Sequence, residues 1–551
     1  MRSCWPILFL TCLTTGPLFA AEQRPNVLFI VSDDLNNLLG TYGDPLAKTP
    51  NLDKLASRGV RFDRAYCSFP LCGPSRNSFL TGLYPNSTGI LSNGQVFRQT
   101  IPSHRSLPQA FRNAGYFAGR IGKLYHYNVP TSVGTNGHDD PGSWELELNP
   151  AGVDRLVEEP QIFSVTPGQF GASLSWYASP KGDRDHTDGL MADDAEWVLE
   201  RFARRKDRPF FLAVGFFRPH TPYVAPKPYF DLHPESTMPV IQGVEEDLVD
   251  IPIPARPVAR RDNRVLDDAK RRQARQAYNA SISFMDAQVG RVVDALDRLG
   301  LSENTIIVFI SDHGYHVGEH GLWQKMSLFE ESARVPLLIV APGLPTKGRV
   351  AKTPVSLVDL YPTLAELSGV ERPTNLQGQS LVPILKDPDA VGRGWAITQV
   401  TRGGAGFGPR PGGGQGTGGG AGGGQGTGGG AGGGQGTGRG AGGGQGTGGG
   451  AAGGQGAAGG TAPTPRFFGY SIRTPRWRYT EWDEGRKGRE LYDHDVDPRE
   501  LTNLAEKSEH ASTVEALSQQ LHAAVKTTFP PDGHTPEIRP GPLWSPNLTN
   551  P

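Results

Sequence analysis

Three short runs of apolar, mostly β-branched or aromatic residues limit most strongly what this chain can fold into. They cover residues 26–31, 210–214 and 305–310. Runs of this length and composition are typical of strands buried on both faces of a parallel sheet. Two longer segments with apolar residues at three-to-four spacing, 190–204 and 269–299, predict helices between the strands. This alternation predicts an α/β domain with a largely parallel sheet, in which ligands bind beyond the carboxyl ends of the strands.

A glycine-rich segment interrupts this pattern. Residues 401–463 contain about half of the 73 glycines, and Gly-Gly-Gly-Gln-Gly-Thr recurs at a fixed spacing. Such a composition offers almost no apolar surface to offset the entropy lost on ordering, so we predict a disordered insertion. The large domain would then cover residues 21–400. Residues 464–551 are predicted to form a small C-terminal α+β subdomain, with strands at 467–473, 477–482 and 490–492 and a helix at 510–527.

The N-terminus reads as a secretion signal. One arginine precedes an apolar run from Trp5 to Leu13, and a cleavage site follows at Ala20. The run is too short to span a bilayer, and so is every later one; the alternative is a buried first strand. We therefore expect residues 1–20 to be removed and the protein to be exported. Nothing in a net charge of -1 suggests nucleic acid or an anionic membrane as a partner, although it says nothing about local pockets.

Two cysteines, Cys67 and Cys72, remain after removal of the signal. In an oxidising compartment they could close a short loop as a disulfide. Cys72 also begins the sequence Cys-Gly-Pro-Ser-Arg, whose proline fits the first turn of a helix. This would place Cys72 at a helix N-terminus, where anions are favoured, with Arg76 one turn along. From the residues alone, an activated thiolate and an inert cysteine at a helix start fit equally well.

The segment from Cys72 to Arg76, followed by Leu80-Thr81-Gly82, resembles the signature of the formylglycine-dependent sulfatases. In that family a dedicated maturation enzyme converts the cysteine to formylglycine. The resemblance implies that one hydroxyl of the hydrated aldehyde attacks sulfur, and that the other then loses a proton and expels sulfate. It also implies an alkaline-phosphatase-like fold, whose large central sheet lies between helices and whose C-terminal subdomain is a four-stranded antiparallel sheet with a helix.

Acidic residues follow two of the predicted strands. Asp33 and Asp34 come after the first run, and Asp312-His313 after the third. Each pair alone could be a helix cap or a structural feature, but together three carboxylates suit Ca²⁺ or Mg²⁺. The resemblance implies that Asp33, Asp34, Asp312, His313 and the modified Cys72 bind one Ca²⁺. Many sulfatases have asparagine in place of His313, and an imidazole leaves more room for Mn²⁺ or Zn²⁺.

Four further residues match catalytic elements of the family in chain order. Lys123 and His126 lie in Gly-Lys-Leu-Tyr-His, His220 in Arg-Pro-His-Thr-Pro, and Lys325 in Gly-Leu-Trp-Gln-Lys. A solvated lysine or a structural histidine is the alternative for each taken singly. By resemblance Lys123 holds the sulfate and the hydrate, and His126 accepts a proton from the second hydroxyl. His220 would contact the ester oxygen, and Lys325 the sulfate and the leaving oxygen.

The charges around this predicted site favour an anionic substrate. Arg76, Lys123 and Lys325, set against three carboxylates and a dication, leave the pocket net positive, as a sulfate ester requires. Two more histidines, His316 and His320, match no role in the family and are expected to be structural. We identify no motif of the family in residues 131–185, and we expect them to contribute to the rim of the pocket.

The resemblance is closest to the iduronate-2-sulfatase subgroup. It implies a sulfuric ester hydrolase that acts on a sulfated uronic acid or another sulfated sugar, in the periplasm, outside the cell or in a lysosome-like compartment. A formylglycine-generating enzyme would be its maturation partner. Two alternatives stay open: a phosphoesterase or phosphonate hydrolase with the same site, and a non-catalytic exported surface protein whose glycine-rich segment carries the function. The residues that resemble the subgroup are 210–222, 275–290, 311–314, 318–321 and 469–474.

Overall fold

The computed structural model describes residues 24–205, 207–256, 266–403 and 465–538. The predicted secretion signal and nearly all of the glycine-rich segment lie outside these ranges, so both remain predictions. Within the described ranges, no helix is long and apolar enough to serve as a membrane span.

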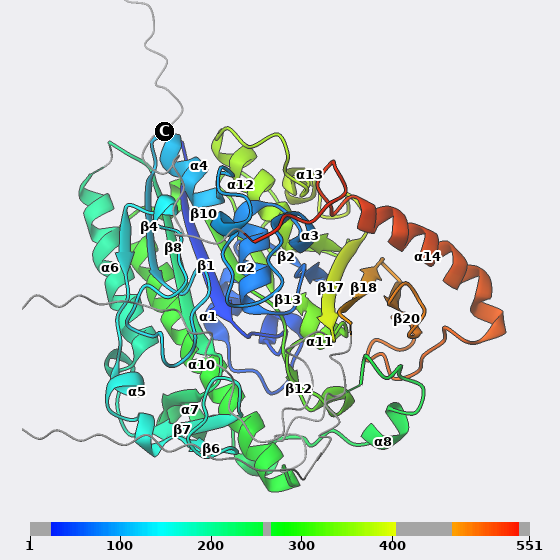
Figure 1. Ribbon diagram of the computed structural model, residues 1–551. Coiled ribbons are helices and arrows are strands. Elements are labelled where there is room, and N and C mark those ends of the chain that lie inside the picture. The colour runs from blue at the N-terminus through cyan, green and yellow to red at the C-terminus, as the bar shows by residue number, and fades with distance from the viewer. Residues whose placement is uncertain (1–23, 206, 257–265, 404–464, 539–551) are drawn as a thin grey trace, which may run out of the picture. The chain divides into compact units, whose positions relative to one another are not determined.

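An eight-stranded sheet forms the centre of the fold (Figure 1). Strand β1 (Asn26–Asp33) pairs in parallel with β10 (Thr305–Ser311) on one side and with β8 (Phe210–Pro219) on the other. One strand, β14 (Leu337–Val340), runs antiparallel to both of its neighbours in this sheet. The predicted mixed, mostly parallel sheet is therefore confirmed. Its remaining strands are β2 (Val60–Phe62), β4 (Phe117–Gly122), β5 (Leu146–Leu148) and β15 (Arg349–Ala351), in the order β15–β2–β14–β10–β1–β8–β4–β5.

Strand β8 is longer than its apolar run predicted, because it ends at Pro219 instead of Val214. All of its residues are buried, so the strand continues through the core past the expected end. The register between β1 and β8 shifts after Ser32, and Asp33 pairs with Pro219. Consequently Asp33 and His220, which are far apart in the sequence, leave the sheet at the same edge.

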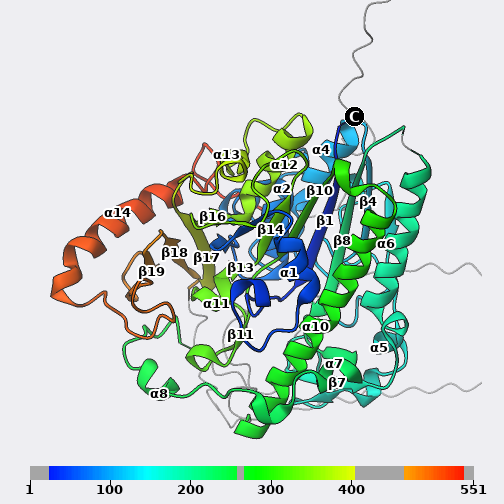
Figure 2. The same cartoon turned by 180° about the vertical axis from the view of Figure 1, so that it is seen from behind.

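Helices cover both faces of the sheet, and alternate residues of β1 point into two separate cores. Leu28 and Ile30 pack with α6 (Thr187–Arg204) and α10 (Asp268–Arg298), which confirms both predicted helices. Figures 1 and 2 show these two helices on one face of the sheet and a second set on the other. The second set packs with Val27, Phe29 and Val31 and comprises α2 (Cys72–Thr81), α4 (Leu107–Asn113) and α12 (Leu360–Ser368).

A separate four-stranded antiparallel sheet packs against α14 (Ala511–Lys526). Three of its strands lie where the sequence predicted them. The fourth, β17, precedes the glycine-rich segment, and its last residue Arg402 pairs with Phe467. The sheet therefore joins residues from both sides of that segment, and the alkaline-phosphatase-like architecture is confirmed. Its strands are β17 (Ala396–Arg402), β18 (Phe467–Arg473), β19 (Trp477–Trp482) and β20 (Arg489–Asp493).

Candidate active site

Helix α2 carries Cys72 into the centre of the site. Cys72 is the first helical residue after an extended Leu71, and the whole helix is buried. Sγ of Cys72 lies 3.2 Å from Nζ of Lys325 and 3.3 Å from Nε2 of His313. The predicted helix start is confirmed. The positive end of the helix dipole lies at this end of α2 and favours an anion beside Cys72.

Cys67 and Cys72 do not form the disulfide that their spacing allowed, because both are free and buried. The Cys67 side chain packs in an apolar core, and its thiol donates to the carbonyl oxygen of Ser332 at 3.9 Å. Burial raises the pKa of Cys67 well above its ordinary value. The two cysteines thus occupy different surroundings, and Cys72 alone faces the charged residues described here.

Three carboxylates meet at the carboxyl ends of β1 and β10. Asp33 is the last residue of β1, Asp34 follows it, and Asp312 follows β10. Because Ser32 pairs with Ser311, the two strands end side by side. Asp34 takes a left-handed backbone conformation with φ of 64°, and its N–H donates to Oδ1 of Asp312 at 3.1 Å. This local turn brings the three acids to one point.

Three basic side chains bind these carboxylates. Arg76 bridges two of them, with Nη2 3.1 Å from Oδ1 of Asp33 and Nε 2.8 Å from Oδ2 of Asp312. Nζ of Lys123 lies 2.6 Å from Oδ2 of Asp33. Three cations therefore balance three anions, so a bound dication would leave the site with a net positive charge. Lys325 completes the set, with Nζ 2.5 Å from Oδ1 of Asp34.

The ring orientations of two histidines are fixed by backbone carbonyls. Nδ1 of His313 lies 2.9 Å from the carbonyl oxygen of Gly314, and that of His220 lies 2.6 Å from the carbonyl oxygen of Thr221. If each Nδ1 carries the donated proton, each Nε2 is left facing the carboxylates. Nε2 of His313 lies 3.3 Å from Oδ1 of Asp34, and Nε2 of His220 lies 3.7 Å from Oδ2 of the same residue.

The third histidine, His126, lies on the other side of Cys72. Its Nε2 is 3.1 Å from Oδ1 of Asn128, and it interacts with the Cys72 thiol. Burial lowers the pKa of His126 below its ordinary value, so the ring is neutral near pH 7. A neutral imidazole at this position is able to accept a proton.

Burial and charge shift the pKa values of several site residues. Burial alone would raise the pKa of Cys72, but Lys123 and Lys325 outweigh it and hold that pKa well below its ordinary value. Burial raises the pKa of Asp312 to about 6 despite the nearby Arg76. Burial would lower the pKa of His313, yet the adjacent Asp312 raises it to about 9. Perturbed groups concentrated in this way are typical of functional sites.

The donor set at this point fits a divalent cation. Possible ligand atoms of Asp33, Cys72, Asp312 and His313 all lie within 4.8 Å of one another, and a second such group joins Asp34 and His220 to Asp33 and Cys72. Oδ2 of Asp34 is buried and has no hydrogen-bond partner among the described residues. Hard carboxylate oxygens suit Ca²⁺ or Mg²⁺, and the imidazole extends the range to Mn²⁺.

The structure brings all of the predicted site residues together and buries all of them except Lys325, which is partly buried. The exposed fraction of each is small, reaching 9% for the side chain of Lys325. The roles assigned to them by resemblance remain predictions. They are Asp33, Asp34, Cys72, Arg76, Lys123, His126, His220, Asp312, His313 and Lys325.

The sequence did not point to three polar residues at the edge of the site. Oδ1 of Asn93 accepts a hydrogen bond from the N–H of Gly73 at 2.9 Å. Nδ1 of His138 lies 3.1 Å from the carbonyl oxygen of Asn93, and its ring centroid lies 5.7 Å from that of His126. His138 lies in the 131–185 segment, in which the sequence analysis identified no motif of the family, and Asn93 belongs to no motif. Asn128, the partner of His126, had one signal: it follows the Gly-Lys-Leu-Tyr-His element by two positions.

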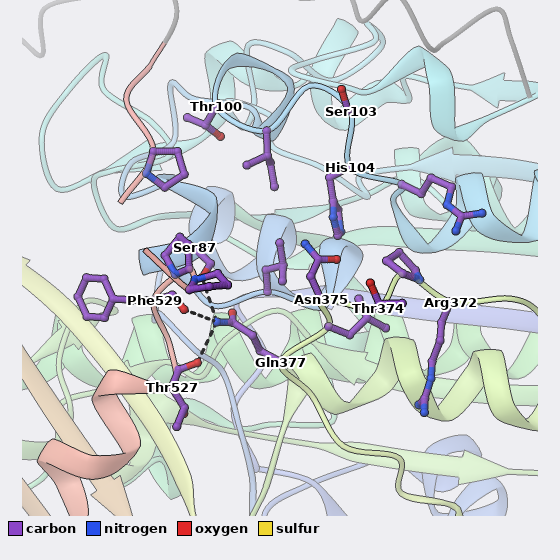
Figure 3. A pocket seen from close by; sticks show the side chains of 18 of the residues that line it. Ser87, Thr100, Ser103, His104, Arg372, Thr374, Asn375, Gln377, Thr527 and Phe529 are labelled. Carbon is purple, nitrogen blue, oxygen red and sulfur yellow. Dashed lines mark hydrogen bonds between the residues drawn. The ribbon is translucent and has the colours of Figure 1, made fainter. Parts of the chain in front are cut away.

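A separate cavity of about 1160 Å³ lies near the C-terminal end of α2 (Figure 3). His104 lines it and contacts the carbonyl oxygen of Thr81 through Nε2 at 2.8 Å. Gln377 also lines the cavity, and its Nε2 donates to Oγ of Ser87 and to the carbonyl oxygens of Thr527 and Phe529. None of the predicted site residues lines this cavity, so the candidate chemistry lies elsewhere.

Comparison with known proteins identifies the family. A family model described as Sulfatase matches residues 25–370. A sulfatase of Formosa agariphila is 37% identical and covers 71% of this chain and 79% of that protein. Iduronate 2-sulfatase of Homo sapiens is 33% identical and covers 67% of this chain and 74% of that protein. The structure of the phosphonate monoester hydrolase of Agrobacterium radiobacter shares the fold, with a TM-score of 0.67 at 23% identity over 92% of this chain and 96% of that one. The chain therefore belongs to the sulfatase family, and it is a sulfuric ester hydrolase.

Proposed function

We propose that this enzyme hydrolyses a sulfate ester of a sulfated uronic acid or a related sugar, and that formylglycine made from Cys72 is the nucleophile. The observation that carries the proposal is the position of Cys72. Its Sγ lies at the buried N-terminus of α2, 3.2 Å from Nζ of Lys325 and 3.3 Å from Nε2 of His313. A reacting group held there faces positive charge on one side and the carboxylate cluster on the other.

The modification explains why the nucleophile can be regenerated. A hydrated aldehyde at position 72 supplies two hydroxyl groups on one carbon, one to attack sulfur and the other to expel sulfate. His126 interacts with this position and has a pKa lowered by burial, so it is able to take the proton of the second hydroxyl. Asn128 holds Nε2 of His126 at 3.1 Å and orients the ring.

The metal would be held by Asp33, Asp34, Asp312, His313 and the modified residue 72. When bound, Ca²⁺ supplies positive charge beside the sulfate and the hydrate; Mg²⁺ and Mn²⁺ are alternatives. The partnerless Oδ2 of Asp34 supports this assignment. So does Arg76, which pairs with both Asp33 and Asp312 and keeps their carboxylates in place.

The basic residues would bind the sulfate and assist the leaving group. Lys123 is buried and Lys325 is partly buried beside Cys72, where a sulfate group in reaction with residue 72 would lie. In a site closed to water, such fixed positive charges stabilise the developing negative charge strongly. Lys325 and His220 both contact Asp34. We assign to these two the donation of a proton or hydrogen bond to the ester oxygen.

The sugar substrate is proposed from the relatives. Iduronate 2-sulfatases of Homo sapiens and Mus musculus are 33% and 34% identical to this chain. A choline-sulfatase of Rhizobium meliloti is also 34% identical, so overall similarity alone does not select the substrate. The predicted signal at residues 1–20 supports an exported enzyme that a formylglycine-generating enzyme matures. Export would place it where sulfated glycans are encountered.

The test compares the matured enzyme on four substrates. We expect the kcat/KM on an aryl sulfate to exceed the kcat/KM on the matching aryl phosphate and on the matching aryl ester of phenylphosphonate. We also expect sulfate release from an oligosaccharide that bears a 2-O-sulfated uronic acid, and none from the enzyme with Asp312→Ala. Preference for the phosphonate would instead support the phosphonate hydrolase alternative. Activity on the aryl sulfate without release from any sulfated sugar would overturn the substrate assignment alone.

A further inference from the structure

The loop that carries His220 depends on side chains outside the predicted site for its conformation. His220 directly follows β8 and lies between Pro219 and Pro222. Prolines have no N–H, so this loop has few backbone donors for its own carbonyl groups. The N–H of His220 donates to the carbonyl oxygen of Phe217 at 2.9 Å. The buried carbonyls that follow His220 need donors from elsewhere.

Arg218 supplies these donors. Its Nη1 donates to the carbonyl oxygen of Pro222 at 2.9 Å and to that of His220 at 3.4 Å. Because the donors of a guanidinium point in fixed directions, the contact sets where these two carbonyls lie. The carbonyl oxygen of Thr221, which lies between them in the chain, is 2.6 Å from Nδ1 of His220. The direction of the imidazole ring therefore depends on the loop conformation that Arg218 holds.

The main chain of Arg218 is fixed on both sides. Its N–H donates to Oδ2 of Asp188, in the first turn of α6, at 2.9 Å. Its carbonyl oxygen accepts a hydrogen bond from Oγ of Ser32 at 2.8 Å. Ser32 directly precedes Asp33, so Arg218 links the loop of His220 to the end of β1 that carries the carboxylates.

Asp154 holds the guanidinium of Arg218. Its Oδ2 lies 2.6 Å from Nη2 of Arg218, and both side chains are 5% exposed. Oδ1 of Asp154 accepts from the N–H and Oγ1 of Thr187 at 2.8 and 2.7 Å, so the carboxylate cannot turn. A buried charge needs such a partner. Asp154 belongs to α5 (Val153–Leu156), within the 131–185 segment, which thus reaches the loop of His220 through the core.

We propose that Arg218 and Asp154 are positioning residues that direct Nε2 of His220 at the ester oxygen of the substrate. Under the proposed leaving-group role of His220, on which this assignment rests, a shift of about 1 Å costs about 100-fold in rate. Nε2 of His220 lies 3.7 Å from Oδ2 of Asp34, inside the predicted site. Arg218 and Asp154 contact the loop and not the metal ligands, so they act on the leaving group alone.

The test is Arg218→Lys in the matured, full-length enzyme. A lysine keeps the positive charge beside Asp154, but its single ammonium cannot reproduce the fork that serves both carbonyls. We expect kcat/KM to fall about 10–100-fold on a sugar sulfate and less than about threefold on an aryl sulfate with a good leaving group. Asp154→Asn, which keeps the side-chain size, should change the same quantities in the same direction and carries the test if Arg218→Lys does not fold.

The decisive readout is the dependence of rate on the leaving group. The values of log kcat/KM are plotted against the pKa of the released phenol for a series of aryl sulfates. The slope should be steeper for Arg218→Lys than for the wild type, as it should be for His220→Ala, because poor leaving groups need the proton most. Loss of folded or metal-loaded enzyme lowers the rate on every substrate by the same factor and leaves the slope unchanged.

Arg98→Lys is a matched control. Arg98 is also buried and binds one carboxylate, that of Asp140, and two loop carbonyls, those of Pro102 and His104. That loop carries none of the predicted site residues. Arg98→Lys should therefore leave the slope at the wild-type value, whatever its effect on thermal stability.

Two results would overturn the assignment, and they differ in what they leave standing. If His220→Ala steepens the slope but folded Arg218→Lys and Asp154→Asn do not, the two residues do not position His220, and the proposed function is untouched. If His220→Ala itself leaves the slope at the wild-type value, the leaving-group role of His220 is wrong, and the positioning role fails with it.

Discussion

Two buried charged clusters in this enzyme use the same kinds of side chain with different results. The Arg478 cluster consists of Glu330, Arg478, His494 and Glu500. Arg478 pairs with both glutamates, and Nε2 of His494 lies 2.7 Å from Oε1 of Glu500. A backbone N–H also donates to Oε2 of Glu500 at 2.9 Å. The acids of this cluster are therefore matched by neighbouring donors.

The Cys72 cluster consists of the predicted site residues named above. Like the Arg478 cluster, it contains a buried arginine that bridges two acids. Arg76 bridges Asp33 and Asp312 as Arg478 bridges its glutamates. Yet Oδ2 of Asp34 and Nδ1 of His126 are buried and have no hydrogen-bond partner among the described residues. A set of closed ion pairs fixes structure, whereas partnerless atoms that face one point indicate a place for an ion and a substrate. Four predictions, from the largest expected effect to the smallest, sharpen this contrast.

The largest effect should come from Asp312→Ala in the Cys72 cluster. The change removes a proposed metal ligand and leaves Arg76 without one of its two acids. We expect kcat/KM to fall by about 10³-fold or more, because metal charge stabilisation is lost. Metal content should fall with it. Asp231→Ala, which removes an exposed acid paired with Lys227, is the control and should change neither quantity. Retained metal and activity in Asp312→Ala would remove Asp312 from the site.

The next effect separates the steps of the reaction. Lys325→Ala and His220→Ala should slow a sugar sulfate by about 10²–10⁴-fold and an aryl sulfate much less, because a phenolate leaves with little help from a proton donor. His126→Ala should instead slow the release of sulfate, so that sulfated enzyme accumulates. Steady-state rates on both substrates and intact-protein mass measure these effects. If Lys325→Ala slows both substrates equally, the leaving-group role is wrong.

The third effect belongs to the Arg478 cluster and should appear in stability. Arg478→Met leaves Glu330 and Glu500 buried without their main partner, which should cost about 3–5 kcal/mol of unfolding free energy. Chemical denaturation measures it, and below the transition the rate on an aryl sulfate should be nearly normal. Arg486→Met, at an exposed arginine, is the matched control and should leave stability unchanged. A stable Arg478→Met would show that the cluster does not support the fold.

The pH dependence of the stability of Arg478→Met tests whether Arg478 stabilises the charged forms of Glu330 and Glu500. Burial would raise the pKa of Glu330, but Arg478 and neighbouring bases hold it well below its ordinary value, and the pKa of Glu500 is lowered as well. In the wild type their contribution to stability is present above the pKa of the unfolded state and is lost as the pH falls below it. Without Arg478 burial prevails and the carboxylates favour protonation. The deficit of Arg478→Met should therefore shrink as the pH is lowered.

The smallest effect should come from replacing residues 404–464 with a short glycine–serine linker. Arg402 and Phe467 pair directly at the ends of β17 and β18, so a few residues are enough to connect them. Shortening a flexible connection should change the free energy of closure by about 1–2 kcal/mol in the stabilising direction. Thermal unfolding and aryl sulfatase assays measure the outcome. A lower Tm, or loss of activity on the small substrate, would show that the segment is structured.

Local sequence patterns predict the central strands and the residues of the candidate active site. The apolar runs at 26–31 and 305–310 become β1 and β10 because strands buried on both faces need continuous apolar residues. The cysteine motif and the acids after these strands predict the Cys72 cluster, because parallel strands bring their carboxyl ends to one edge.

Strand order and side-chain clusters that depend on contacts between distant parts of the chain cannot be predicted from such local patterns. Nothing near β14 indicates that it inserts antiparallel between β10 and β2. The Arg478 cluster joins residues of α11 (Glu330–Ala333) with β19 and the segment after β20, and no local motif connects them. His316 and His320 lie near Glu331, but this contact depends on how distant parts of the chain pack, so the sequence alone does not indicate it.

The most direct measurement is the mass of the peptide that contains residue 72, taken from active enzyme. Purified enzyme with a known fraction of active sites is digested, and the Cys72 peptide is analysed by mass spectrometry after labelling with an aldehyde-specific reagent. The proposed mechanism predicts that the active fraction equals the fraction of peptide that carries formylglycine and takes the label. Fully active enzyme whose residue 72 is an intact thiol would contradict it.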